Sequence, residues 1–249
     1  MNIMTALLLS TIICFQVSTG SQRNLVTKHD HTSEIADLLR RLHPIDGQDS
    51  VKAPGLETLQ AVELRLTYIA EQSPEGRAQV IKALIKVVDD PEAKREWPIA
   101  HRWILAVDLL GYLRATEAID ALVANLDHTG ENGIMSSIHF APVNRALDNI
   151  GKPAVPQLIQ ALGSDQEEIR FQAALTLARI GKPALPSLFD ALSGNQVSAK
   201  GGVAMVLAWI GGKDAKQAIQ HAIEIESNEQ SRRELEQALT EFNRRWKDQ

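Results

Sequence analysis

The sequence contains a single cysteine among its 249 residues, Cys14. One cysteine cannot form a disulfide within the chain, so no disulfide framework holds the fold together. Because Cys14 lies in an apolar segment that we expect to be removed, the mature protein would also lack a thiolate for catalysis or metal binding. Aromatic residues make up only 4% of the chain, so the core must consist mainly of Ala, Leu, Ile and Val. This composition favours packed helices over a β-sandwich.

Sequence motifs for catalysis, nucleotide binding and metal binding are also missing. The G-x-S-x-G, Walker A and G-x-G-x-x-G patterns do not occur, and no pair of histidines has the H-E-x-x-H spacing. The net charge of -5 gives no electrostatic signature of a nucleic-acid-binding protein. We therefore expect no cofactor, no metal, no nucleic-acid partner and no enzymatic activity.

The first twenty residues predict an export signal. No charged residue occurs before Arg23, and residues 6–17 are apolar at all but three positions. This length suits the apolar region of a signal peptide and is short for a membrane span. Ser18 and Gly20 supply small residues before a cleavage site that follows Gly20. We expect residues 1–20 to be a signal peptide and the mature protein to be exported, to the periplasm or outside the cell.

Other interpretations of this segment remain open because it lacks Lys and Arg near its start. It could be an uncleaved anchor, a wrongly assigned start or a buried segment. Contact with a membrane is expected only if the segment is not cleaved.

One phrase occurs twice in the sequence, thirty residues apart. Residues 146–162 and 176–192 are identical at ten of 17 positions. Residues 206–211 repeat the middle of the phrase once more, and residues 106–126 contain an earlier copy with a short insertion. Self-similarity at a fixed period is typical of a solenoid built from stacked units.

Each unit has the pattern of two helices joined at a glycine corner. An apolar stripe that includes Leu177 leads to Gly181, which is expected to end the first helix. Pro183 and Pro186 follow and are tolerated only in the first turn of the next helix. Ser164 and Glu167 have the spacing of a capping box at the start of the unit. We expect Leu147, Leu177 and Leu207 to occupy equivalent buried positions.

The pattern A-x-x-L-x-x-I-G-K-P-A-[VL]-P-x-L-[IF]-x-A-L resembles HEAT repeats, in particular the short HEAT-like repeats first associated with phycobilin lyases. The resemblance extends over residues 97–223. It implies an all-α fold, a right-handed α-α superhelix of about five helix pairs with N- and C-terminal capping helices. Residues 21–72 would be an irregular segment with capping helices, and residues 73–249 the solenoid. HEAT proteins are mostly scaffolds, and the repeat carries no shared catalytic residue.

One unit is longer than the others. From Leu126 to Ile150 the chain advances 24 residues, whereas the next two units advance 18 each. The extra residues lie within residues 127–140, where His128 and His139 are candidate partner contacts. Insertions in solenoids often lie on the binding side, although a tolerated loop is the alternative.

A second candidate site follows from the repeat register. In HEAT-like arrays the second helix of each unit usually lines the concave side. Two sets of equivalent positions should face outward or into the groove: Asp108, Asp148, Ala178 and Ala208, and Leu109, Asn149, Arg179 and Trp209. Arg145 would pair with a carboxylate of the first set. Trp209 beside Arg179 is the kind of pair found at binding hot spots. Local packing is the alternative for each of these residues.

These observations favour a non-enzymatic, monomeric scaffold that binds an unknown protein or peptide. The alternatives are an enzyme or maturation factor of the lyase type, with a pocket near residues 127–140, and a structural spacer. Converging ionisable groups would favour an enzyme, whereas a broad groove with exposed Trp and Arg would favour binding.

Overall fold

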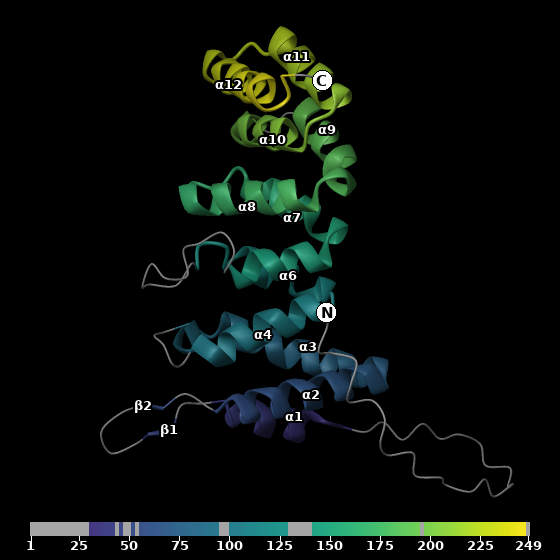
Figure 1. Ribbon diagram of the computed structural model, residues 1–249, viewed down its shortest axis with the longest axis vertical. Helices are drawn as coiled ribbons and strands as arrows, with labels where there is room; N and C mark the ends of the chain where they lie inside the picture. Colours follow the sequence, from purple (N-terminus) through teal and green to yellow (C-terminus); the bar gives the residue numbers. More distant parts are fainter. Residues whose placement is uncertain are drawn as a thin grey trace, which may run out of the picture.

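The computed structural model describes residues 30–42, 45–46, 51–52, 55–94, 100–128, 141–194 and 197–247. Within these ranges twelve α-helices form an elongated stack, with α1 at one end and α12 at the other (Figure 1). The expected signal peptide, and all of the long insert except Asp127 and His128, lie outside the described residues.

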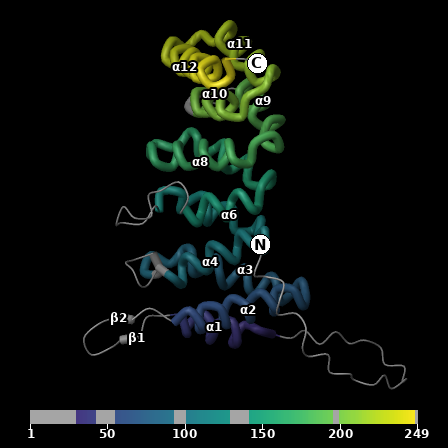
Figure 2. The backbone as a smooth tube through the Cα atoms, viewed as in Figure 1, coloured from purple at the N-terminus to yellow at the C-terminus, as the bar shows by residue number. Residues whose placement is uncertain are grey.

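The helices form two rows that run along the stack. In each row, consecutive members pack against each other. The A row contains α2 (Leu56–Gln72), α4 (Ala100–Tyr112), α6 (Pro142–Ile150), α8 (Glu167–Ile180), α10 (Val197–Ile210) and α12 (Glu229–Arg245). The B row contains α3 (Pro74–Asp89), α5 (Ile119–Val123), α7 (Val155–Ala161), α9 (Leu185–Ser193) and α11 (Lys213–Ile225). The backbone trace in Figure 2 follows the chain as it alternates between the rows.

This arrangement confirms the all-α solenoid with about five helix pairs. The pairs run from α2–α3 to α10–α11, and α1 (Thr32–Arg40) and α12 cap the two ends. The domain boundary expected after residue 72 falls between α2 and α3, which pack along one another. A small feature was not expected: β1 (Ile45–Asp46) pairs antiparallel with β2 (Val51–Lys52).

The repeated phrase forms the corner between an A-row and a B-row helix, as predicted. Gly151 and Gly181 have φ of 76° and 69° and end α6 and α8. A side chain is disfavoured in this left-handed region, so glycine suits the position. The lysine, proline and alanine that follow form the short 3-10 turns η4 (Lys152–Ala154) and η5 (Lys182–Ala184), which lead into α7 and α9.

The three leucines of the repeat occupy equivalent buried positions. Leu147, Leu177 and Leu207 are each 0% exposed, on α6, α8 and α10. Each therefore contributes its full apolar area to the contact between rows and neighbouring units. This confirms the register predicted from the period of thirty.

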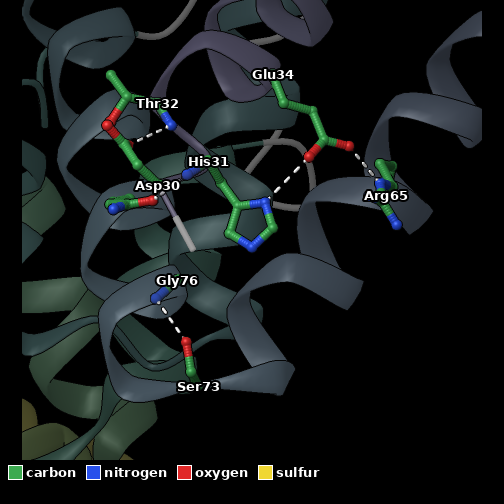
Figure 3. Close-up of polar contacts among 8 residues, drawn as sticks. Asp30, His31, Thr32, Glu34, Arg65, Ser73 and Gly76 are labelled. Atoms are coloured by element: carbon green, nitrogen blue, oxygen red, sulfur yellow. Dashed lines mark hydrogen bonds and ion pairs between the residues drawn. The ribbon is translucent and has the colours of Figure 1, made fainter. Parts of the chain in front are cut away.

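Serine side chains act at the starts of two helices in different ways. Ser73 caps α3, because its Oγ accepts a hydrogen bond from the Gly76 amide at 3.0 Å (Figure 3). The capping box at Ser164 is wrong, since α8 begins at Glu167, with Gln166 as its N-cap residue. The Ser164 Oγ instead accepts from the Gln166 amide at 3.2 Å and shapes the turn before the helix.

The N-terminal cap is held to α2 by one carboxylate. Glu34 of α1 accepts a hydrogen bond from Arg65 Nε at 2.6 Å and lies 3.0 Å from His31 Nδ1 (Figure 3). Hydrogen bonds from Arg65 and His31 lower the pKa of Glu34. The Asp30 carboxylate accepts from the Thr32 amide at 2.9 Å and so sets the chain at the start of α1.

Candidate functional site

The charged residues predicted on the A row form ion pairs between successive units. Asp108 of α4 lies 2.6 Å from Arg145 of α6, and Asp148 of α6 lies 2.5 Å from Arg179 of α8. The expectation that Arg145 would pair with a carboxylate is confirmed. These contacts link neighbouring helices of the row, so each of the four residues already has a charged partner within the array.

The two ion pairs differ in burial. Asp108 and Arg145 are both half exposed, whereas the Asp148 side chain is only 16% exposed. Burial raises the pKa of Asp148 to about 6, even though Arg179 acts to lower it. Within the described part of the chain, its Oδ1 atom accepts no hydrogen bond. Asp148 is therefore a carboxylate whose charged form the fold tolerates poorly.

Trp209 has a different partner from the one expected. The arginine over its indole ring is Arg245 of α12, with the guanidinium carbon 5.7 Å from the ring centroid. The sequence register placed Arg179 beside Trp209 but could not show that α12 packs across α10. Trp209 remains partly exposed.

Two positions expected to face outward are buried. Ala208 is 0% exposed because α12 covers α10, and Trp246 donates its indole N–H to the Ala208 carbonyl at 2.9 Å. Leu109 is 2% exposed because α4 packs against α2 and α3 as well as α6. The outward prediction was wrong for both residues, since it assumed that every A-row helix has the same neighbours.

The two histidines are not brought together as a described site. The His128 ring packs edge-on against Trp103, with ring centroids 4.6 Å apart. His139 and the remainder of the insert lie outside the described residues, so the predicted pocket there stays a prediction. Among the residues that the structure describes, no group of three or more His, Cys, Asp or Glu side chains could hold a metal ion.

The described surface has a groove over α8, α10 and α12, which we call the C-terminal groove. It consists of two adjoining cavities of about 740 and 620 Å³ that share Met205, Trp209 and Gln237. Phe171 of α8, which is 44% exposed, lines the larger cavity. The groove therefore lies across three A-row helices and contains two partly exposed aromatic rings, one from α8 and one from α10.

The charged side chains that line the C-terminal groove are of two kinds: arginines that donate to other groups of the protein, and carboxylates most of which have no ion-pair partner among the described residues. Arg170 donates to the carbonyls of Ser164 and Asp165, Arg233 pairs with Glu229, and Arg245 pairs with Glu241 at 2.6 Å. Hydrogen bonds from Arg244 and Arg245 hold the pKa of Glu241 at about 2. Four lining carboxylates have no ion-pair partner among the described residues: Asp165, Glu167, Glu234 and Glu236.

Sequence reasoning found Trp209 but missed Phe171 and the groove itself. A signal for Phe171 was present, because it occupies the repeat position where Ala141 and Gly201 stand in the neighbouring units. The neighbouring units pack with small residues at this position, so packing of the repeat does not explain a large aromatic residue there. The carboxylates of α12 gave no comparable signal, since this helix lies beyond the repeated phrase.

The geometry defines the class of protein: a solenoid of stacked helix pairs with an exposed groove near its C-terminal end. The family of HEAT repeats matches residues 143–199 and 155–240, which confirms HEAT repeats across residues 143–240. The phycobilin-lyase type of repeat stays a prediction. No curated protein matches the chain.

Several solved structures are similar to the chain at low identity. An engineered protein is 20% identical, with a TM-score of 0.34, covering 85% of this chain and 97% of its own. A computationally designed armadillo repeat protein for modular peptide recognition is 20% identical, with a TM-score of 0.33, covering 84% and 100%. Human deoxyhypusine hydroxylase, solved with glycerol, is 15% identical, with a TM-score of 0.32, covering 86% and 97%.

Proposed function

We propose that the protein is a non-enzymatic scaffold that binds a protein or peptide partner along the exposed face of the A row. The observation that carries this proposal is the distribution of exposed large hydrophobic side chains. Of six such residues in the described chain, five lie on the A row and only Ile225 lies on the B row. The A-row residues are Leu56, Leu64, Tyr68, Tyr112 and Phe171.

The asymmetry between the rows has no explanation in stability alone. Both rows bury apolar faces in the same core, and both have outer faces in contact with water. Exposed aromatic residues gain nothing from solvent, whereas tyrosine, tryptophan and arginine are enriched at binding hot spots. Their concentration on one row favours a partner that lies along that row.

The N-terminal part of this face is organised around two tyrosines. The Tyr112 hydroxyl of α4 lies 3.4 Å from Glu71 of α2, and the Arg65 guanidinium lies 5.1 Å from the centre of the Tyr68 ring. The Tyr112 ring is thus held by a neighbouring helix and the Tyr68 ring by a residue of its own helix. Rings held in this way lose little further freedom when a partner covers them. This arrangement supports binding by a surface that is already formed.

We further propose that the protein acts as a monomer and is exported, with residues 1–20 removed. Export rests on the uncharged, apolar start of the sequence. In the described part of the chain, no helix is long and apolar enough to span a bilayer. The mass of the protein purified from its native host tests cleavage, and its cell fraction tests export. A chain that still begins at Met1 would overturn cleavage, and its recovery in the cytoplasmic fraction would overturn export.

Selection from a displayed library of random twelve-residue peptides tests the binding proposal. We expect enriched peptides to lose at least tenfold in affinity for a Tyr112→Ser, Phe171→Ser double variant. The control is Ile225→Ser, which removes a residue as exposed as Tyr112 from the B row. It should leave affinity unchanged. Peptides that bind both variants as tightly as the unchanged protein would show that the A-row face is not the binding surface.

A further inference from the structure

We propose that the C-terminal groove takes an extended peptide segment of a partner protein that carries lysine or arginine. This inference rests on the proposed scaffold function and specifies the chemistry of the partner at one end of the A row. Two independent features of the groove support it: its charge balance and its exposed aromatic rings.

The charge available to a ligand in the groove is negative. The three arginines that line it already donate to carboxylates or carbonyl oxygens of the protein. Asp165, Glu167, Glu234 and Glu236 line the same groove and have no ion-pair partner among the described residues. With Glu241, five carboxylates line the groove against three arginines. A basic segment would therefore meet an excess of negative charge, whereas an acidic segment would be repelled by it.

One of these carboxylates lies directly over the floor of the groove. A Cβ atom at Gly201 would collide with the Glu234 side chain, so Glu234 is packed against the α10 backbone at a point where no side chain intervenes. The Glu234 Oε1 atom accepts a hydrogen bond from Gln230 at 3.0 Å, so the carboxylate is held in place by a neutral donor and keeps its negative charge for a ligand.

The aromatic rings favour the same ligand. Phe171 and Trp209 come from adjacent A-row helices and are both partly exposed in the groove. Aromatic faces attract lysine and arginine cations, and Trp209 already holds Arg245 in this way. The aliphatic stem of a lysine or arginine can also cover apolar ring surface while its charged end reaches a carboxylate.

The groove sets the length of the segment. Packed helices lie about 8–10 Å apart, so a ligand crossing three A-row helices spans roughly 20 Å. An extended chain advances about 3.3 Å per residue, so about six residues fill this distance. Eight-residue peptides are therefore long enough to test the proposal.

The experiment measures the fluorescence anisotropy of three labelled eight-residue peptides with the full chain. All three contain leucine at alternate positions, and the remaining positions are lysine and arginine, glutamine, or glutamate. We expect saturable binding of the basic peptide, at least tenfold tighter than binding of the glutamine peptide, with no binding of the glutamate peptide. Raising the salt concentration from 50 to 500 mM should lower the affinity of the basic peptide at least fivefold.

A pair of matched variants locates the binding. The double variant Glu234→Gln, Glu236→Gln should lower the affinity for the basic peptide about tenfold and leave the affinity for the glutamine peptide unchanged. The control, Glu117→Gln with Asp120→Asn, removes the same charge from two exposed positions, one in the 3-10 turn before α5 and one in the first turn of α5. It should change binding less than twofold. An equal loss in both variants would mean that the basic peptide responds to net charge and would overturn the groove as its site.

The outcomes separate this inference from the proposed function. Equal or tighter binding of the glutamine or glutamate peptide would overturn the preference for a basic segment and leave peptide binding intact. If none of the three peptides binds while library peptides still depend on Tyr112 and Phe171, the A-row scaffold stands and the groove inference fails. If library peptides also ignore those two residues, both proposals fail.

Discussion

Two neighbouring interfaces of the solenoid use different chemistry in the same register. Between α6 and α8, Asn144 donates to the Thr176 hydroxyl at 2.7 Å and to the Gln172 carbonyl at 3.1 Å. Between α8 and α10, the equivalent positions are held by Ala174 and Val206, and both are buried. The first interface also has the Asp148–Arg179 ion pair, whose two positions are held by Ala178 and Trp209 in the next unit.

The comparison teaches that the repeat requires the leucines and the corner glycine, while the residues between them adapt to each interface. A buried polar pair satisfied within the interface fixes the register of two helices, because any shift leaves a donor unpaired. Apolar contacts supply most of the free energy but are less specific.

The largest effect should come from the shared leucines. Replacing Leu147, Leu177 or Leu207 with alanine should each lower the free energy of unfolding by about 2–5 kcal/mol, since each is fully buried. Urea unfolding followed by circular dichroism measures this loss. Suppose that Leu147→Ala lowers the free energy of unfolding by less than about 1 kcal/mol while Leu207→Ala lowers it by more. The polar contacts between α6 and α8 would then compensate for the lost leucine, and the three leucines would not be equivalent in energy.

The next largest loss of stability should come from the corner glycines, and it should be larger for Gly211 than for Gly181. Gly181→Ala forces a left-handed conformation on alanine and should cost about 1–2 kcal/mol. Gly211→Ala adds a collision, because its Cβ would lie 2.5 Å from the Trp246 ring. We expect Gly211→Ala to lose about 2 kcal/mol more than Gly181→Ala. Equal losses in the same urea experiment would show that Trp246 moves aside freely and that α12 packs loosely on α10.

A smaller effect should come from the polar contact between α6 and α8. Asn144→Ala removes two hydrogen bonds but leaves the Thr176 hydroxyl bonded to the Gln172 carbonyl at 2.8 Å. We expect a loss of about 1–3 kcal/mol. A double-mutant cycle with Thr176→Val should give a coupling energy near 1 kcal/mol. Additive losses would mean that the two side chains do not act as a unit.

The fold could be predicted from the sequence because its determinants recur. Gly181, Pro183 and Leu177 each have a counterpart thirty residues away, and chance does not produce such matches. The corner and the buried leucines followed from local rules that hold wherever the phrase occurs. The prediction of a capping box at Ser164 was wrong because a serine side chain can bond either the amides of a helix start or the backbone of a turn. Here it stabilises the turn that precedes α8.

The candidate site could be predicted only in part, because it depends on which helices meet. The ion pair of Asp108 and Arg145 followed from the register. The contact of Trp209 with Arg245 did not, since α12 lies outside the repeated phrase and its position on α10 depends on packing. Ala208 was misjudged for the same reason. Burial of Asp148 is likewise a property of the assembled interface and leaves no local mark in the sequence.

The smallest effect should depend on pH and concerns Asp148. Its pKa is about 6 in the folded protein, above the ordinary value of 3.8, because burial disfavours the charged form. The folded state therefore binds a proton more tightly than the unfolded state, so this group destabilises the protein above pH 6. The penalty disappears as the pH falls from 6 towards 4. Asp148→Asn should thus raise the free energy of unfolding by about 1 kcal/mol at pH 7.5, after allowance for solvent screening, and leave it unchanged near pH 4.

Asp108→Asn is the matched control, because it also removes the carboxylate of an ion pair between units but at a half-exposed site. It should lower the free energy of unfolding by less than about 1 kcal/mol at pH 7.5. The Arg179 side chain is 46% exposed, so it stays hydrated when Asp148 loses its charge. A clear loss of stability in Asp148→Asn at pH 7.5 would instead mean that attraction to Arg179 exceeds the penalty of burial. In that case the Asp148–Arg179 ion pair would stabilise the interface between α6 and α8, and Asn144 would fix its register.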